Sequence, residues 1–104
     1  MKKTSDMSQF REGESVKVPC EIQPGAFAEE NLITVNTGSE VISGFVRSEY
    51  LIKETPTRGY VKGIVLRVQG NTITVQIPGS FFTRASGIAN VSQSWADSNL
   101  ERTA

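Results

Sequence analysis

Side chains able to carry out nucleophilic or acid–base chemistry are scarce in this chain. Its 104 residues include no histidine and a single cysteine, Cys20. A Ser–His–Asp or Cys–His nucleophile is therefore excluded, and so are the standard structural zinc sites, which draw on cysteine and histidine. Cys20 falls on the apolar side of an alternating segment, where cysteine packs as a small hydrophobe, and no neighbour is positioned to stabilise its thiolate.

The remaining candidates for catalysis are carboxylates and glycine-rich loops. No spacing singles out a general acid and a general base among the glutamates considered, which are Glu21, Glu29, Glu30, Glu49 and Glu54. The nine glycines form no Gly-x-Gly-x-x-Gly or Walker pattern and fall where turns need them. We therefore expect a chain that is not an enzyme and holds no metal and no cofactor.

Cations and aromatic residues gather in the middle of the chain. The formal net charge is zero, but residues 44–84 carry six basic and two acidic side chains. Small barrels that bind single-stranded nucleic acid combine stacking aromatics with cations that follow the phosphates. An alternative hypothesis is therefore nucleic-acid binding by the basic segment 47–84, through Arg58, Tyr60, Lys62, Arg67, Phe82 and Arg84. Simple alternation along a strand places Arg67 on the face opposite Arg58 and Lys62.

The elements that position these residues are predicted from hydrophobic alternation. Val16, Val18, Cys20 and Ile22 share one side of a strand. Pro19 predicts either an edge strand or a strand whose second half lies outside the ladder. Two further strands, 32–36 and 41–46, flank a tight turn and form a hairpin.

A second hairpin is predicted around Gly70-Asn71, a dipeptide that suits the positive φ values of a two-residue turn. Its strands cover 60–69 and 72–77. In the second strand Ile73, Val75 and Ile77 face the core. In the first strand the residues on the predicted apolar face are Tyr60, Ile64, Leu66 and Val68, although Val61 and Val65 are apolar too, so that this strand is covered on both sides or shared between two sheets.

The connecting segments are predicted from their turn residues and caps. Pro24-Gly25 opens a loop anchored by Phe27, and Pro78-Gly79 ends the second hairpin. Residues 80–84 are expected to form a helical turn and 87–92 a short strand. Ser94 would then cap a helix over 95–102, with Trp95 and Leu100 packing on the barrel. A weak echo between residues 21–27 and 76–81 is consistent with a duplication and also with coincidence, because Pro-Gly is a common strand breaker.

The stretch Gly44-Phe45-Val46-Arg47-Ser48-Glu49-Tyr50-Leu51 resembles the end of SH3 and bacterial SH3-like domains. In that family a glycine lets two strands approach, and a 3₁₀ turn after the aliphatic residue plugs the barrel. The resemblance covers residues 13–53, and Arg47 stands where a proline is usual. It implies a small barrel and, by analogy, partner contacts at Phe27, Phe45, Tyr50 and the pair Glu29 and Glu30.

Together these patterns predict an all-β protein, a small SH3-like barrel or two-sheet β-barrel, either single or duplicated, with short helical turns. Residues 1–12 are expected to be a flexible tail, 13–95 one barrel domain, and 96–104 a helical turn or tail. The favoured function is non-catalytic recognition of a protein partner, or self-association, through rim aromatics and edge strands. A small-molecule-binding barrel is a further alternative. The location is expected to be cytoplasmic, without membrane contact.

Overall fold

The computed structural model describes residues 10–82 and 87–103. Within these residues nine strands form one antiparallel sheet, which confirms the all-β prediction. The strands are β1 (Ser15–Pro24), β2 (Glu30–Asn36), β3 (Val41–Arg47), β4 (Leu51–Thr55), β5 (Arg58–Gln69), β6 (Thr72–Gln76), β7 (Ser80–Phe81), β8 (Ile88–Ser92) and β9 (Glu101–Arg102). A 3₁₀ turn, η1 (Ser48–Tyr50), precedes β4, and a short helix, α2 (Gln93–Asn99), precedes β9. Neither helical element described is long and apolar enough to cross a membrane.

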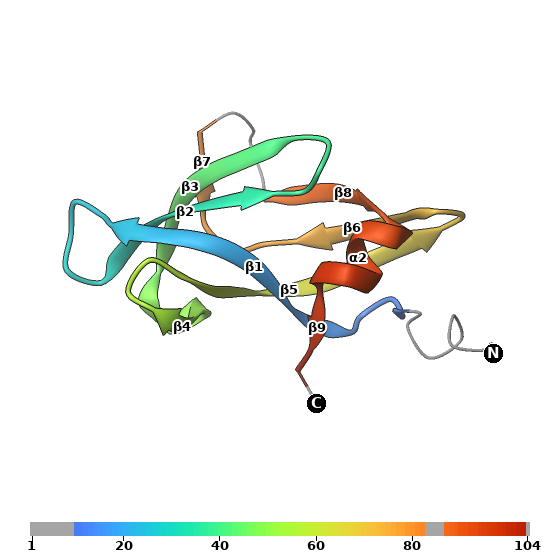
Figure 1. Cartoon of the computed structure of the whole chain (residues 1–104), viewed down its shortest axis with the longest axis horizontal. Helices are drawn as coiled ribbons and strands as arrows, with labels where there is room; N and C mark the ends of the chain where they lie inside the picture. The colour runs from blue at the N-terminus through green and yellow to red at the C-terminus, as the bar shows by residue number, and fades with distance from the viewer. Residues whose placement is uncertain (1–9, 83–86, 104) are drawn as a thin grey trace.

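The sheet runs in the order β7-β3-β2-β1-β5-β6-β8, with β4 added to β5 and β9 added to β1. It curls around a single core, as Figure 1 shows, so that β2 and β3 lie above β5 and β6. The two longest strands carry this curl. β1 pairs with β2, β5 and β9, and β5 pairs with β1, β4 and β6. Each therefore exchanges partners partway along its length.

The alternation in β1 is confirmed, because Val16, Val18, Cys20 and Ile22 are all buried. Both expectations for Pro19 were wrong. β1 is a central strand. It pairs with β9 only up to Lys17 and with β2 only from Glu21 onward, so one edge of β1 is unpaired between these two residues. On the β5 side Ile22 donates its N–H to the Thr57 carbonyl. Backbone groups alternate along a strand, so the N–H that Pro19 lacks would point to the bare edge.

The β5–β6 hairpin is confirmed, with Gly70 at φ +60° in its turn. Ile73, Val75 and Ile77 are buried as predicted. The predicted inner face of β5 was wrong: Val61 and Val65 are buried, whereas Ile64 is 46% and Leu66 40% exposed. The physical reason lies in the two glycines on the inner side, Gly59 and Gly63, which make that face look less apolar than the outer one.

A β-bulge changes the face that the end of β5 presents. Val65 pairs with Val75, but Arg67 and not Leu66 pairs with Thr74. The extra residue, Leu66, resets the alternation, so that Arg67 faces outward and Val68 packs against the core. The expectation that Arg67 lies on the face opposite Lys62 was therefore wrong.

Three other local expectations need correction. Residues 80–81 do not begin a helical turn; they form β7, which pairs with Gly44 and Phe45 of β3. Residues 83–86 lie outside the described residues. The cap of α2 is Ser92, whose Oγ accepts the Trp95 N–H at 3.1 Å, and the helix ends at Asn99 rather than at residue 102.

The C-terminal segment nevertheless packs on the barrel as expected. Leu100 is buried in the core cluster, and Trp95 packs against that cluster partly buried. The indole also lies under the β2–β3 turn, close to Gly38. This contact ties α2 to the hairpin on the opposite side of the curled sheet.

At the other end of the chain the described residues begin inside the core. Residues 1–9 of the predicted tail lie outside the described residues. Phe10 is buried, however, and the Arg102 guanidinium lies 4.5 Å from its ring centre. Packing therefore includes part of the segment 1–12 that was expected to be a flexible tail.

The 3₁₀ turn implied by the resemblance is present as η1, directly after β3. Gly44 does allow a close strand approach, because a Cβ atom at this position would overlap the Ser80 carbonyl oxygen of β7. The turn differs in one respect from what was implied. None of its three residues is buried, so it does not plug the core.

Candidate functional site

The outer side of β2, β3 and β7 forms an exposed apolar surface. Leu32 lies directly opposite Phe45, and Thr34 lies opposite Ser43. These side chains face outward, because inward residues such as Ile33 and Val35 fill the alternate positions. Phe82 follows β7 and donates its N–H to the Ser43 carbonyl at 3.1 Å. We call this surface the β2–β3–β7 face and define it by Leu32, Thr34, Val41, Ser43, Phe45 and Phe82.

An aromatic pair stands at the centre of the β2–β3–β7 face. The rings of Phe45 and Phe82 meet edge to face, with their centres 5.3 Å apart and an interplanar angle of 74°. Phe45 is half-buried, whereas Phe82 is 59% exposed. Val41, at the start of β3, is exposed as well. The face thus presents ring and branched aliphatic surface to the solvent.

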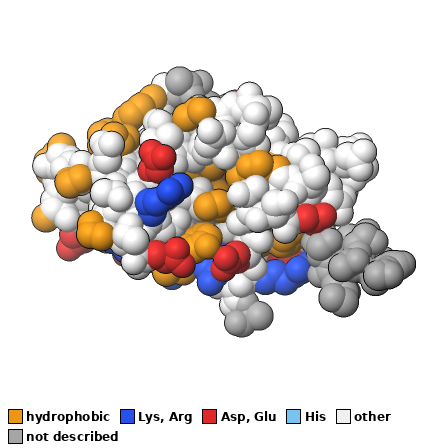
Figure 2. Space-filling view, in the orientation of Figure 1, with side chains coloured by type: hydrophobic (Ala, Val, Ile, Leu, Met, Phe, Trp, Pro, Cys, Tyr) orange, Lys and Arg blue, Asp and Glu red, His pale blue; other side chains and the backbone are white. Residues whose placement is uncertain are grey.

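None of the residues that define this face is charged. In Figure 2 apolar side chains gather at the upper left, over β3 and β7, and charged side chains lie below them. Charged residues border it on two sides: Glu21 of β1 lies opposite Thr34, and at the end of β3 Arg47 pairs with Glu29 at 3.3 Å and with Glu49 at 3.9 Å. Such exposed pairs contribute little to stability, but they place a polar rim beside the apolar surface.

The residues predicted to bind a partner are not all in one place. Phe45 belongs to the β2–β3–β7 face, and Glu30 lies opposite Arg47 at its edge, next to the Glu29–Arg47 ion pair. Phe27 was expected to anchor its loop, but it projects from the β1–β2 loop and is 73% exposed. Backbone bonds hold that loop instead, including Gly25 N–H to the Glu30 carbonyl. Tyr50 lines a different hollow, beside β5.

The residues predicted to bind nucleic acid divide between two surfaces. Arg58, Tyr60, Lys62 and, through the bulge, Arg67 share the outer side of β5. Phe82 lies on the β2–β3–β7 face, several strands away in the sheet order. Arg84 lies outside the described residues. The aromatic and cationic partners of the predicted site are therefore only partly brought together.

Tyr60, the aromatic residue on the outer side of β5, is already engaged. Its hydroxyl donates to Glu101 Oε2 at 2.8 Å, and the Lys17 ammonium lies 5.7 Å from its ring centre. Lys17 also pairs with Glu101 at 3.7 Å. The hydrogen bond to Glu101 is the main reason that the pKa of Tyr60 is raised above its ordinary value. These contacts leave less of the ring free for stacking on a base.

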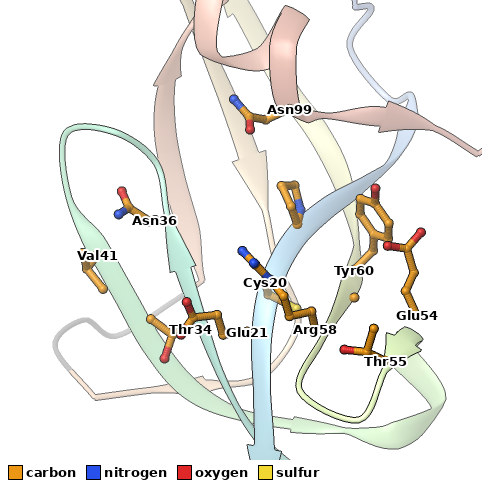
Figure 3. A pocket seen from close by; sticks show the side chains of 12 residues that line it. Cys20, Glu21, Thr34, Asn36, Val41, Glu54, Thr55, Arg58, Tyr60 and Asn99 are labelled. Atoms are coloured by element: carbon orange, nitrogen blue, oxygen red, sulfur yellow. The ribbon is translucent and has the colours of Figure 1, made fainter.

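The bare edge of β1 borders a hollow of about 520 Å³ (Figure 3). Pro19 and Cys20 line it from β1, Asn36 from β2 and Asn99 from the end of α2. The Arg58 side chain extends over β1 toward Glu21. Because the lining contains Glu21 and Glu54 as well as Arg58, charges of both signs surround the hollow and no single sign of ligand charge is favoured.

Metal and thiol chemistry have no structural support in the part of the chain that the structure describes. No three residues among its His, Cys, Asp and Glu are placed to hold a metal ion. Burial raises the pKa of the Cys20 thiol to about 12, which keeps the sulfur protonated at neutral pH. This environment is that of a structural cysteine.

Sequence reasoning missed the partners of Phe45 on the β2–β3–β7 face. Leu32 had a usable signal, because a strand that buries Ile33 and Val35 must turn Leu32 outward. The position of Phe82 beside Phe45 had no such signal, since it depends on the pairing of β7 with β3 across 35 residues of chain.

Comparison with protein-family models, curated proteins and solved structures gives no match for this chain.

Proposed function

We propose that this chain is a non-catalytic recognition module that binds a protein partner through the β2–β3–β7 face. The observation that supports this proposal most directly is the exposure of Phe82, which rests edge-on against Phe45 with more than half of its surface open to water. Aromatic residues held in a fixed orientation are typical of the residues that dominate binding energy in protein interfaces.

The composition of the face supports the same function. Interface centres are depleted in charged residues and surrounded by a polar rim. Here the uncharged face is bordered by Arg47 with Glu29 and Glu49. The paired hydroxyls of Thr34 and Ser43, 3.3 Å apart, add hydrogen-bonding capacity to an otherwise apolar surface.

The partner is either a second copy of this chain or a different protein, and both fit an uncharged face. An isologous dimer places a patch against itself, and a patch without ions does so without like-charge repulsion. Nucleic-acid binding has weaker support, because Glu21 and Glu101 lie among the cations of the β5 side and Tyr60 is engaged by Glu101. Steering of a polyanion needs a surface of predominantly one charge.

The test compares the wild-type chain with Phe82→Ser. The substitution removes an exposed ring, so the fold should be retained, which circular dichroism and thermal unfolding will check. Sedimentation equilibrium over a wide concentration range shows whether the wild type self-associates. If it does, we expect Phe82→Ser to weaken the dimer about tenfold or more.

If the wild type is monomeric at all concentrations, the partner is a different protein. A binding protein purified after capture from the source cell should then lose at least about tenfold in affinity for Phe82→Ser. Phe27→Ser is the matched control, because it removes a ring that is even more exposed but lies in the β1–β2 loop. Equal affinity of Phe82→Ser and wild type for every partner found would refute the proposal.

A further inference from the structure

A hollow of about 430 Å³ lies across β5, between Ser15 and Val16 of β1 on one side and Tyr50, Gln76 and Pro78 on the other. The last β4 pairing is Leu51 with Val61, and the first β6 pairing is Ile64 with Gln76. Between them, the register of β6 would place Pro78 opposite Lys62. Proline has no N–H, so the ladder cannot continue, and the two strands leave β5 uncovered at this point.

The walls of this hollow are mainly apolar. Tyr50 comes from η1, Ile64 from β5, and Pro78 follows β6. Ile64 and Tyr50 are both large hydrophobic residues that remain exposed. Polar groups also line the hollow, among them the Gln76 amide and the hydroxyls of Ser15 and Thr103. An apolar recess of this volume with a few convergent polar groups is typical of sites for small ligands.

Lys62 gives the hollow its charge. It is the only charged side chain among the lining residues, and no carboxylate lines the hollow. Within the described residues the Lys62 ammonium has no ion pair. The nearest cation across the ladder, Lys17, is paired with Glu101. An unpaired ammonium beside apolar walls favours an anion that carries a hydrophobic group.

We infer that this hollow binds a small amphipathic carboxylate, a ligand with one carboxylate on an aromatic or branched aliphatic body. The Lys62 ammonium takes the carboxylate, and Tyr50, Ile64 and Pro78 cover the body. The volume is that of a small-molecule site, which is why we assign it to a small ligand rather than to a protein surface. The inference does not depend on the β2–β3–β7 face, which is built by other strands.

The experiment titrates 3-phenylpropionate into the ¹⁵N-labelled full chain and follows backbone amide shifts by NMR. We expect saturable shifts at Gly63, Ile64 and Gln76. The neutral analogue 3-phenylpropionamide should bind about tenfold more weakly, because it cannot pair with the ammonium. Absence of saturation, or equal affinity for the acid and the amide, would overturn the inference.

Two variants make the test specific to the lysine. Lys62→Met keeps an apolar stem of similar length and removes the charge, so it should lose about tenfold in affinity for the acid and leave the amide unchanged. Lys53→Met is the matched control, since Lys53 is an exposed lysine on β4 that does not line this hollow. Equal losses in the two variants would show a general charge effect and reject the site.

A final arm distinguishes a small molecule from a chain terminus. A tripeptide that ends in phenylalanine carries the same carboxylate and ring on a peptide body. Weaker or equal binding of this tripeptide supports the small-molecule assignment. Binding at least tenfold tighter than that of 3-phenylpropionate would reject the assignment in favour of a peptide C-terminus.

Discussion

Gly44 of β3 lies in close contact with the backbone of β7. An added Cβ atom would overlap the Ser80 carbonyl oxygen and would lie 2.8 Å from the Phe81 Cα. Both are backbone groups, so neither can move aside without shifting β7. The glycine is therefore required for space, and the position of Phe82 against Phe45 depends on it because Phe82 directly follows β7.

Gly44→Ala should consequently destabilise the protein. We expect the free energy of unfolding to fall by about 1–3 kcal/mol, the usual range for overpacking at a close contact. Urea unfolding monitored by Trp95 fluorescence measures this change. The control is Gly70→Asn, because Gly70 has open space around it and asparagine tolerates its positive φ. Equal stability of Gly44→Ala and wild type would show that β7 can yield.

At the scale of single residues the sequence predicted much of the core and part of the candidate site. The buried positions of β1 and β6 follow from alternation alone. Phe45 was expected to contact a partner, but Phe82 was assigned to a nucleic-acid surface. Its neighbours depend on a strand pairing between distant parts of the chain, and no local pattern contains that information.

The strand elements show where alternation stops being a reliable guide. In β5 glycines occupy two inner positions, Gly59 and Gly63, so the inner face looks less apolar in the sequence than the outer face. The bulge at Leu66 then exchanges the two faces. A bulge is defined by which residues pair across strands, so the sequence of β5 alone does not reveal it.

The helix shows the same limit for caps. Both Ser92 and Ser94 precede Trp95, and both residue types favour the N-cap position. The choice is decided by where β8 ends, because Ser92 is the last residue of that strand and has the extended backbone that a cap requires. The hydroxyl of Ser94 lies 3.3 Å from that of Ser92 but does not accept the Trp95 N–H.

We therefore expect Ser92→Ala to destabilise the protein by about 1 kcal/mol, since it leaves the Trp95 N–H without its acceptor. Ser94→Ala, two residues away in the same helix, should cost less than half as much. Thermal and urea unfolding of the two variants under the same conditions provide the comparison. A larger loss of stability in Ser94→Ala than in Ser92→Ala would show that Ser94, and not Ser92, is the N-cap.

On the scale of the whole molecule the curled sheet encloses one core, and Cys20 lies on its inner side. The sequence predicted this all-β architecture from alternation and turn residues. It did not predict that two strands would exchange partners along their length, because that depends on how the ends of four other strands, β2, β4, β6 and β9, meet β1 and β5. The hollows beside these strands were unpredictable for the same reason.

Cys20 provides a measure of how often the core opens. With its pKa raised to about 12 by burial, the thiol should react with iodoacetamide at pH 8 at least about a hundredfold more slowly in the native chain than in urea. Mass spectrometry of quenched samples gives both rates. Similar rates in the two conditions would mean that the thiol is accessible in the folded protein.

The same thiol makes stability depend on pH in a defined direction. The folded state keeps the proton while the unfolded state ionises at the ordinary pKa of 9.0, so the contribution is complete below pH 9 and is lost as the pH rises from 9 toward 12. Cys20→Val should lack this component. An identical pH dependence in the variant would assign the effect to other groups.

Both hollows lie where a proline interrupts pairing: Pro19 lines the one beside β1, and Pro78 the one beside β5. Their outlines are thus set by the main chain, and the side chains above them have no part in the ladder. Substitutions at the exposed residues Asn36, Lys62 or Gln76 should accordingly change the lining of a hollow without disturbing the interior. The shape of each hollow and the chemistry of its lining can therefore change independently of each other.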